Sequence, residues 1–133
     1  MSKKTILFNT PIDAISLRET VEIVEAAIRN NQQLHHIAVN VAKIVKMQTD
    51  KELYNSVVSA DIISADGMPL VWVSKLIGTP IPERVTGVDL MQELVKLSAR
   101  ENYKIYFLGA SEEVVSAVVE IYRNDFGSGI IAG

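Results

Sequence analysis

The sequence contains no cysteine, which excludes disulfide bonds and thiolate zinc sites and agrees with a cytoplasmic location. It also lacks a long apolar run. No stretch approaches the roughly 20 apolar residues that a membrane-spanning helix needs. Near the N-terminus the apolar run covers only residues 6–8, which is too short for the core of a signal peptide. We therefore expect neither a membrane span nor a secretory signal in this chain.

Several catalytic and cofactor motifs are missing as well. The chain has no P-loop, H-E-x-x-H or C-x-x-C pattern. It also has no G-x-G-x-x-G, and this absence argues against a nicotinamide-dependent oxidoreductase. It has no D-x-D pair, and adjacent His35 and His36 would point to opposite sides of a strand. We therefore expect no metal site. The formal net charge of −3 gives no general attraction to nucleic acid.

What is present fits one soluble α/β domain. Hydrophobic residues make up 48% and charged residues 22% of 133 residues, enough for a buried core. Strand-like and helix-like segments alternate along the chain, which predicts a Rossmann-like, mostly parallel sheet with helices on both faces. The expected strands are 4–15 with a turn at 9–11, 35–41, 61–66 and 103–110. The expected helices are 16–31, 42–60 with a break at 49–50, 69–78, 88–102 and 111–126.

Parallel sheets bind ligands at the carboxyl ends of their strands, and three predicted strand ends carry candidate residues. Asp66 could act as a general base on a sugar hydroxyl, and Gly67 would let a ligand approach the backbone. Asp66 could equally be a helix N-cap, the interpretation that the residues alone slightly favour. Asn40 could bind a substrate or satisfy a strand-to-helix turn. Gly109 and Ala110 form a turn that could approach a ribose or a base.

The loop at 82–90 is a candidate diphosphate site. Arg84 offers a planar fork for phosphate, and the helix start after Thr86 and Gly87 offers backbone N–H groups. Alternatively, Arg84 is a surface residue paired with Glu83 or Asp89. The apolar segment 69–77, which includes Trp72, is either core or a surface for a lipid or a partner. Core is the favoured interpretation, and homo-oligomerisation stays open.

Three segments together identify a family resemblance. "ADGMPLVWVSKLIGTPIPERVTGVDLM" at 65–91 closely resembles the signature region of the WecG/TagA/CpsF glycosyltransferases, glycosyltransferase family 26. "VNVAKI" at 39–44 and "YKIYFLGAS" at 103–111 resemble two further segments of that family. The resemblance implies transfer of N-acetylmannosamine from a UDP-sugar, without a metal or other cofactor. The implied acceptor is N-acetylglucosamine on a membrane polyprenyl diphosphate, in wall teichoic acid synthesis.

The same resemblance assigns roles to residues of this chain. Asp66 is implied as the base, Asn40 in sugar binding, and Arg84 in holding the UDP diphosphate, with inversion at the anomeric carbon. The resemblance assigns no role to the other residues that we expect to contact the substrate, which are Gly67, Thr86, Gly87, Asp89, Gly109 and Ala110. A location at the inner face of the plasma membrane, as a peripheral protein, follows from the acceptor.

Two departures from the family pattern leave alternatives open. The family usually has Thr two residues before the Asn, where this chain has Ala38, so either that hydroxyl is dispensable or activity is weakened. Family members also continue for roughly a hundred further residues, including a basic, apolar tail implied in membrane contact. The strand-like end at 129–133 favours a chain that continues past Gly133, and we expect weak or no catalysis from residues 1–133 alone. The alternative functions are a UDP-sugar-binding module without turnover, or another donor such as N-acetylmannosamine uronic acid or glucose.

Overall fold

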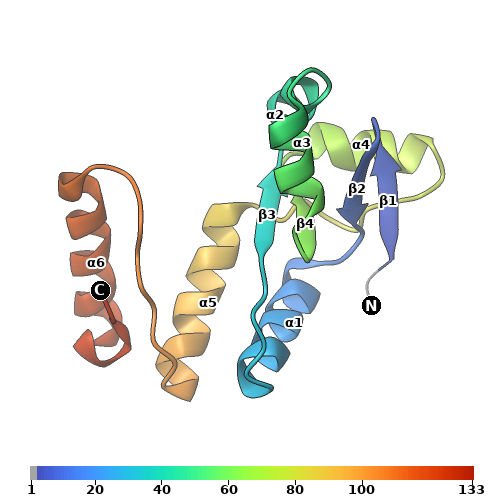
Figure 1. The fold of residues 1–133 in the computed structure, drawn as a ribbon. Coiled ribbons are helices and arrows are strands. Elements are labelled where there is room, and N and C mark those ends of the chain that lie inside the picture. The colour runs from blue at the N-terminus through green and yellow to red at the C-terminus, as the bar shows by residue number, and fades with distance from the viewer. Residues whose placement is uncertain (1–2) are drawn as a thin grey trace. The chain divides into compact units, whose positions relative to one another are not determined.

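The computed structural model describes residues 3–133 (Figure 1). The chain forms two compact units, Met1–Leu90 and Met91–Gly133, and each is described by itself. The expectation of a single domain over residues 1–133 therefore stays a prediction. In the part of the chain that the structure describes, no helix has the length and apolar character needed to cross a membrane.

The first unit opens with a β-hairpin. Strands β1 (Lys4–Leu7) and β2 (Thr10–Asp13) pair antiparallel, with Leu7 opposite Thr10. The turn consists of Phe8 and Asn9, both with positive φ, so the prediction of a turn at residues 9–11 was wrong by one position. Left-handed backbone at both central residues is typical of a type I′ hairpin turn, and this geometry overrides the preference of Pro11 for turns.

A parallel pair of strands forms the centre of the first unit. Strand β3 (His36–Val39) pairs with β4 (Ile62–Ala65), with Val39 opposite Ala65. The other edge of β4 contacts β2, where the buried Asp13 carboxylate accepts a hydrogen bond of 2.7 Å from the Ile63 amide. Lys4 forms an ion pair of 3.0 Å with the same carboxylate. Helices and a parallel strand pair confirm the α/β class.

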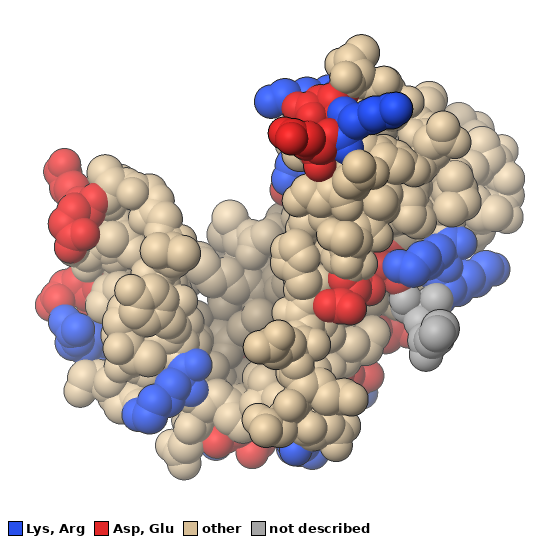
Figure 2. Space-filling model, viewed as in Figure 1, with Lys and Arg blue, Asp and Glu red and all other residues tan. Residues whose placement is uncertain are grey.

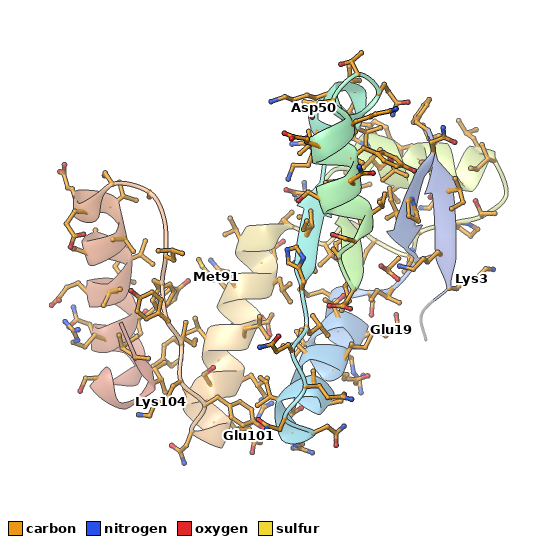
Figure 3. The ribbon with its side chains drawn as sticks, in the orientation of Figure 1. Lys3, Glu19, Asp50, Met91, Glu101 and Lys104 are labelled. Atoms are coloured by element: carbon orange, nitrogen blue, oxygen red, sulfur yellow. The ribbon has the colours of Figure 1, made fainter. Side chains whose placement is uncertain are left out.

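Helix ends follow the predicted caps. Helix α1 (Leu17–Arg29) begins with a capping box between Ser16 and Glu19, and Glu19 is labelled in Figure 3. Helices α2 (Val41–Met47) and α3 (Lys51–Val58) are separate, as predicted, because Asp50 caps the second one (Figure 3). Helix α4 (Met68–Leu76) ends before Gly78, whose φ of 78° suits only a residue without a Cβ. Helix α5 (Gly87–Glu101) starts in the first unit.

The core of the first unit lies between the strands and helices α2, α3 and α4. It consists mainly of Leu7, Ile12, Val39, Ile44, Met47, Val57, Ile63, Leu70, Val71 and Ile81. The prediction that segment 69–77 is core is therefore only half right. Leu70 and Val71 are 1% exposed, whereas Trp72 is 58% and Leu76 86% exposed.

The second unit contains helix α6 (Glu112–Phe126) and a short 3-10 helix η1 (Ser128–Ile130). Ser111 caps α6 as predicted, accepting a hydrogen bond of 3.3 Å from the Val114 amide. The predicted strand 103–110 does not form a regular strand. It pairs with residues 130–133 through a parallel bridge from Ile105 to Ile131 and a hydrogen bond of 2.8 Å from the Phe107 amide to the Gly133 carbonyl.

Candidate active site

Two backbone hydrogen bonds bring the candidate residues of the first unit together. The Asp66 amide donates to the Val39 carbonyl at 2.7 Å, so Asp66 lies beside the end of β3 and next to Asn40. The Val85 amide donates to the Ala65 carbonyl at 2.8 Å, so the loop that carries Arg84 lies beside the end of β4. The site is therefore at the carboxyl edge of the parallel pair, where such sheets bind ligands.

Asp66 supplies a carboxylate without a partner. Its side chain makes no hydrogen bond or ion pair with any residue in 3–133, although it is partly buried. The N-cap position of α4 is Gly67, and no side chain caps that helix, so the interpretation of Asp66 as a helix cap is wrong. A carboxylate that a fold holds at a strand end without a structural partner is available for a ligand.

Asn40 has a structural role and retains a free donor. It is the N-cap of α2, and its Oδ1 accepts a hydrogen bond of 2.8 Å from the Lys43 amide. Within residues 3–133 its Nδ2 has no acceptor. The side chain can therefore cap the helix with its oxygen and donate to a ligand with its nitrogen, so the two interpretations are compatible.

Arg84 lies exposed on a loop that is firmly attached at both ends. Ser74 is fully buried on α4 and accepts a hydrogen bond of 2.9 Å from the Ile81 amide, while Thr5 donates to the Thr79 carbonyl at 2.8 Å. Beyond Arg84, Val85 is 2% exposed and bonded to β4. The loop therefore positions Arg84 through its buried neighbours.

The guanidinium of Arg84 makes no ion pair among the described residues. The expected alternative partner Glu83 instead accepts a hydrogen bond of 2.8 Å from the Leu17 amide at the start of α1. Pairing of Arg84 with Glu83 or Asp89 is therefore not found. The five N–H donors of the guanidinium remain available for an anion.

The start of α5 lies immediately after this loop. The Thr86 hydroxyl accepts a hydrogen bond of 3.0 Å from the Asp89 amide and so caps the helix. The amides of Gly87 and Val88 have no such partner within residues 3–133. Two N–H groups at a helix start, beside an unpaired arginine, favour binding of an anion at this end of the site.

The remaining candidates differ in how much the structure says of them. Gly67 has an extended backbone, and a Cβ there would approach only Pro69 Cδ at 3.8 Å. The fold does not require glycine at this position, which leaves ligand access as its predicted role. Gly109 (φ 126°) and Ala110 (φ 53°) form a left-handed turn in the second unit, so their relation to Asp66 is not described.

Sequence reasoning missed Ser74 and Lys43. Ser74 is the one hydroxyl in the apolar segment 69–77, and a lone hydroxyl in such a segment is a signal for a buried hydrogen-bond role. Lys43 is half-buried and donates from Nζ to the Ala38 carbonyl at 3.0 Å. This hydrogen bond holds the end of β3 beside Asn40. The only sequence signal for this role is that Lys43 lies three residues after Asn40.

One titratable group beneath the site is perturbed. His36 Nε2 lies 2.8 Å from the Ser64 hydroxyl, two residues before Asp66. Burial lowers the pKa of His36, the Asp13 carboxylate partly opposes that shift, and His35 adds to it. Among residues 3–133 no group of three or more His, Asp or Glu side chains is placed to hold a metal ion.

The fold and the site define an α/β protein whose candidate ligand-binding residues lie at the carboxyl edge of a parallel strand pair. The sequence model of the WecG/TagA/CpsF family of glycosyl transferases matches residues 5–133, and the chain belongs to this family. A *Bacillus spizizenii* N-acetylglucosaminyldiphosphoundecaprenol N-acetyl-beta-D-mannosaminyltransferase is 39% identical over 75 residues, 56% of this chain and 29% of that protein. The *Staphylococcus aureus* (strain NCTC 8325) protein of the same name is 28% identical over 117 residues, 86% of this chain and 46% of that protein. The chain thus spans less than half the length of each relative.

Proposed function

We propose that this chain carries the catalytic base and donor site of a glycosyltransferase. The proposed reaction moves N-acetylmannosamine from a UDP-sugar to N-acetylglucosamine linked to a polyprenyl diphosphate. The family assignment and the names of the relatives support this reaction. The observation that carries it is the unpartnered Asp66 carboxylate at the strand edge, between Asn40 and the Arg84 loop.

Asp66 is the proposed general base. Its carboxylate takes the proton from the acceptor hydroxyl as that oxygen attacks the anomeric carbon of the donor. The new glycosidic bond forms as the bond between the anomeric carbon and the UDP oxygen breaks. A single displacement on an α-linked donor inverts the anomeric carbon and gives a β linkage, the linkage named for the relatives.

The negative charge that develops on UDP requires stabilisation. Arg84 can form a two-point hydrogen bond to the diphosphate, and the free amides of Gly87 and Val88 add a positive helix end. In this proposal these groups stabilise the leaving group without a cofactor, and Asn40 Nδ2 orients a sugar. Asp89 and Thr86 contribute by fixing the start of α5.

The proposed acceptor also determines the proposed cellular location of the protein. A polyprenyl diphosphate is a membrane lipid, so the enzyme must meet a membrane surface to reach it. We propose a peripheral position on the cytoplasmic face of the plasma membrane, where nucleotide sugars are available.

The test is a transfer assay with matched donors. The full-length protein is incubated with a short-chain polyprenyl-diphosphate N-acetylglucosamine and, in parallel, with UDP-N-acetylmannosamine, its uronic acid or UDP-glucose. UDP binding is measured by calorimetry. We expect transfer from UDP-N-acetylmannosamine above the other donors. UDP binding without transfer from any donor would contradict the proposal and favour a sugar-nucleotide-binding module.

A further inference from the structure

The outward side of helix α4 is apolar. Leu70, Val71 and Ser74 face the core and are buried, which leaves the opposite side to Pro69, Trp72 and Leu76. These residues are spaced by three and four positions and therefore form one stripe along the helix. Trp72 is 58% and Leu76 86% exposed, and Ile77, just after the helix, is 53% exposed. A surface helix ordinarily turns polar residues outward.

The segment that carries this stripe contains one charged residue, a lysine, and is flanked by Asp66 and Glu83. In residues 67–82 the only charged side chain is Lys75, although the whole chain has a net charge of −3. Strand β1 is held to the loop after α4 by the hydrogen bond from Thr5 to the Thr79 carbonyl. Lys3 directly precedes this strand, and Lys4, its first residue, is paired with Asp13. Figure 2 shows uncharged surface around the far end of α4, and Figure 3 labels Lys3 at the start of β1.

The stripe is continuous with the candidate active site. Helix α4 starts at Met68, directly after Asp66 and Gly67, and the loop that follows it carries Arg84. The stripe therefore begins at Pro69, next to the proposed base, and extends for about 13 Å along nine residues. An acceptor whose lipid part lies along the stripe would have its sugar end near Asp66.

We propose that the outward stripe of α4 (Pro69, Trp72, Leu76 and Ile77) contacts an anionic lipid bilayer. Aromatic and aliphatic side chains in a segment whose one charged residue is Lys75 suit the boundary between head groups and acyl chains. A second copy of the chain fits less well, because a two-fold contact on this stripe would bring the two Lys75 side chains together. The choice of a lipid partner rests on the proposed function.

The test uses Trp72, the only tryptophan of the chain, as a reporter. The protein is mixed with vesicles of phosphatidylglycerol and phosphatidylcholine (1:1), or of phosphatidylcholine alone. We expect a blue shift of Trp72 emission and co-sedimentation with the anionic vesicles. Binding to neutral vesicles should be weaker by roughly fivefold for each lysine that reaches the surface.

Two variants separate the stripe from other apolar residues. Leu76→Glu keeps the reporter and alters a side chain that is 86% exposed, so the fold should persist, which circular dichroism checks. Ile28→Ser changes an apolar side chain on α1 that is 44% exposed and lies outside the stripe. We expect Leu76→Glu to lose vesicle binding at least about tenfold, because it adds an acid to the stripe, and Ile28→Ser to bind as the parent does.

Three results would overturn the inference. They are no blue shift with either vesicle, unchanged binding of Leu76→Glu, or a blue shift without vesicles that accompanies a doubled mass in sedimentation. Transfer assays keep the two proposals apart. Leu76→Glu should retain transfer to a short-chain soluble acceptor and lose it to the acceptor in vesicles. Vesicle binding by a parent protein that transfers no sugar would support this surface and contradict only the proposed function.

Discussion

At the scale of single residues, the fold positions the charged side chains of the site, but these side chains make no contacts within residues 3–133 that stabilise the fold. Asp66 and Arg84 have no side-chain partner among residues 3–133, although hydrogen bonds of the adjacent backbone hold both in place. Neither side chain is used to hold the fold together, so both charged groups are available for a ligand. Substitutions of Asp66 or Arg84 should therefore change ligand binding and leave the stability of the fold unchanged.

Arg84 provides the first such test. We expect Arg84→Ala to weaken UDP binding by about 10- to 100-fold, since charged hydrogen bonds to the diphosphate are lost. Arg84→Lys should recover only part of the affinity, because an ammonium group cannot bind a diphosphate through a planar fork. Calorimetry measures both, and the melting temperature should stay constant. Equal UDP affinity for all three proteins would exclude Arg84 from the donor site.

Gly67 provides the second test of the site. A Cβ at this position would meet only Pro69 Cδ at 3.8 Å, and the extended backbone accepts any residue. We therefore expect Gly67→Ala to change the free energy of unfolding by less than about 0.5 kcal/mol. If a ligand approaches the backbone here, the same substitution should raise KM for the sugar donor or acceptor. An unchanged KM would remove Gly67 from the site.

At the scale of elements, helix α2 and its cap connect folding with binding. Asn40 Oδ1 accepts the Lys43 amide hydrogen bond, and Nδ2 stays available. We expect Asn40→Asp to keep the cap and the stability while losing the donor, so that substrate affinity falls. Asn40→Ala should lose both, with about 1 kcal/mol less stability. Urea unfolding and binding measured on both variants separate the roles. Full binding by Asn40→Asp would leave Asn40 as a cap only.

Sequence patterns predicted most elements, because their signals are local. Ser16 with Glu19, the break before Asp50 and the stop at Gly78 depend on backbone groups a few residues away. The segment 103–110 is not a regular strand, because a strand needs a partner along its length and only Ile105 and Phe107 bond to residues 130–133. Strand propensity carries no information on how many partner residues are in reach.

The candidate site was likewise predictable only where its signals are local in the sequence. Strand order along the sequence indicated that Asn40 and Asp66 would lie at one sheet edge, because parallel strands end together. The contact from Val85 to Ala65, which brings Arg84 there, joins residues far apart in the chain and has no sequence signal of its own. The lone hydroxyl of Ser74 in an apolar segment indicates a buried hydrogen bond, but the sequence does not show that its partner is the Ile81 amide in this loop.

At the scale of the whole molecule, His36 makes stability depend on pH. Its pKa is lowered from 6.5 in the folded state, mainly by burial, so the unfolded chain binds a proton more readily. Stability is then fully present above about pH 6.5 and decreases as the pH falls through the range between the unfolded and the folded pKa. Urea unfolding at pH 7.5 and 5.5 should show this loss.

The His36→Gln variant is the matched control, because an amide can keep a hydrogen bond to Ser64 but does not titrate. We expect its loss of stability between pH 7.5 and 5.5 to be smaller than that of the parent. The same loss in both proteins would mean that His36 does not cause the pH dependence.

The distribution of charge is also a property of the whole molecule. A chain with a net charge of −3 would repel an anionic surface if its charges were evenly spread. The stretch 67–82, which carries the α4 stripe, instead contains Lys75 and no acidic residue, although Asp66 and Glu83 flank it. Together with the site at the start of α4, this arrangement places the proposed chemistry and the proposed membrane contact on one helix.

The proposed function depends on Asp66 acting as a base, and a comparison of two aspartate variants tests this role most directly. Asp66→Asn and Asp61→Asn change the carboxylates that follow and precede the same strand, β4. Asp61 accepts a hydrogen bond of 2.7 Å from the His35 amide, which an asparagine oxygen can also accept. We expect Asp66→Asn to lower the rate of sugar transfer by about 100- to 10,000-fold, with unchanged melting temperature and UDP affinity, and Asp61→Asn to transfer like the parent. Equal transfer rates for the parent and Asp66→Asn would contradict the central claim.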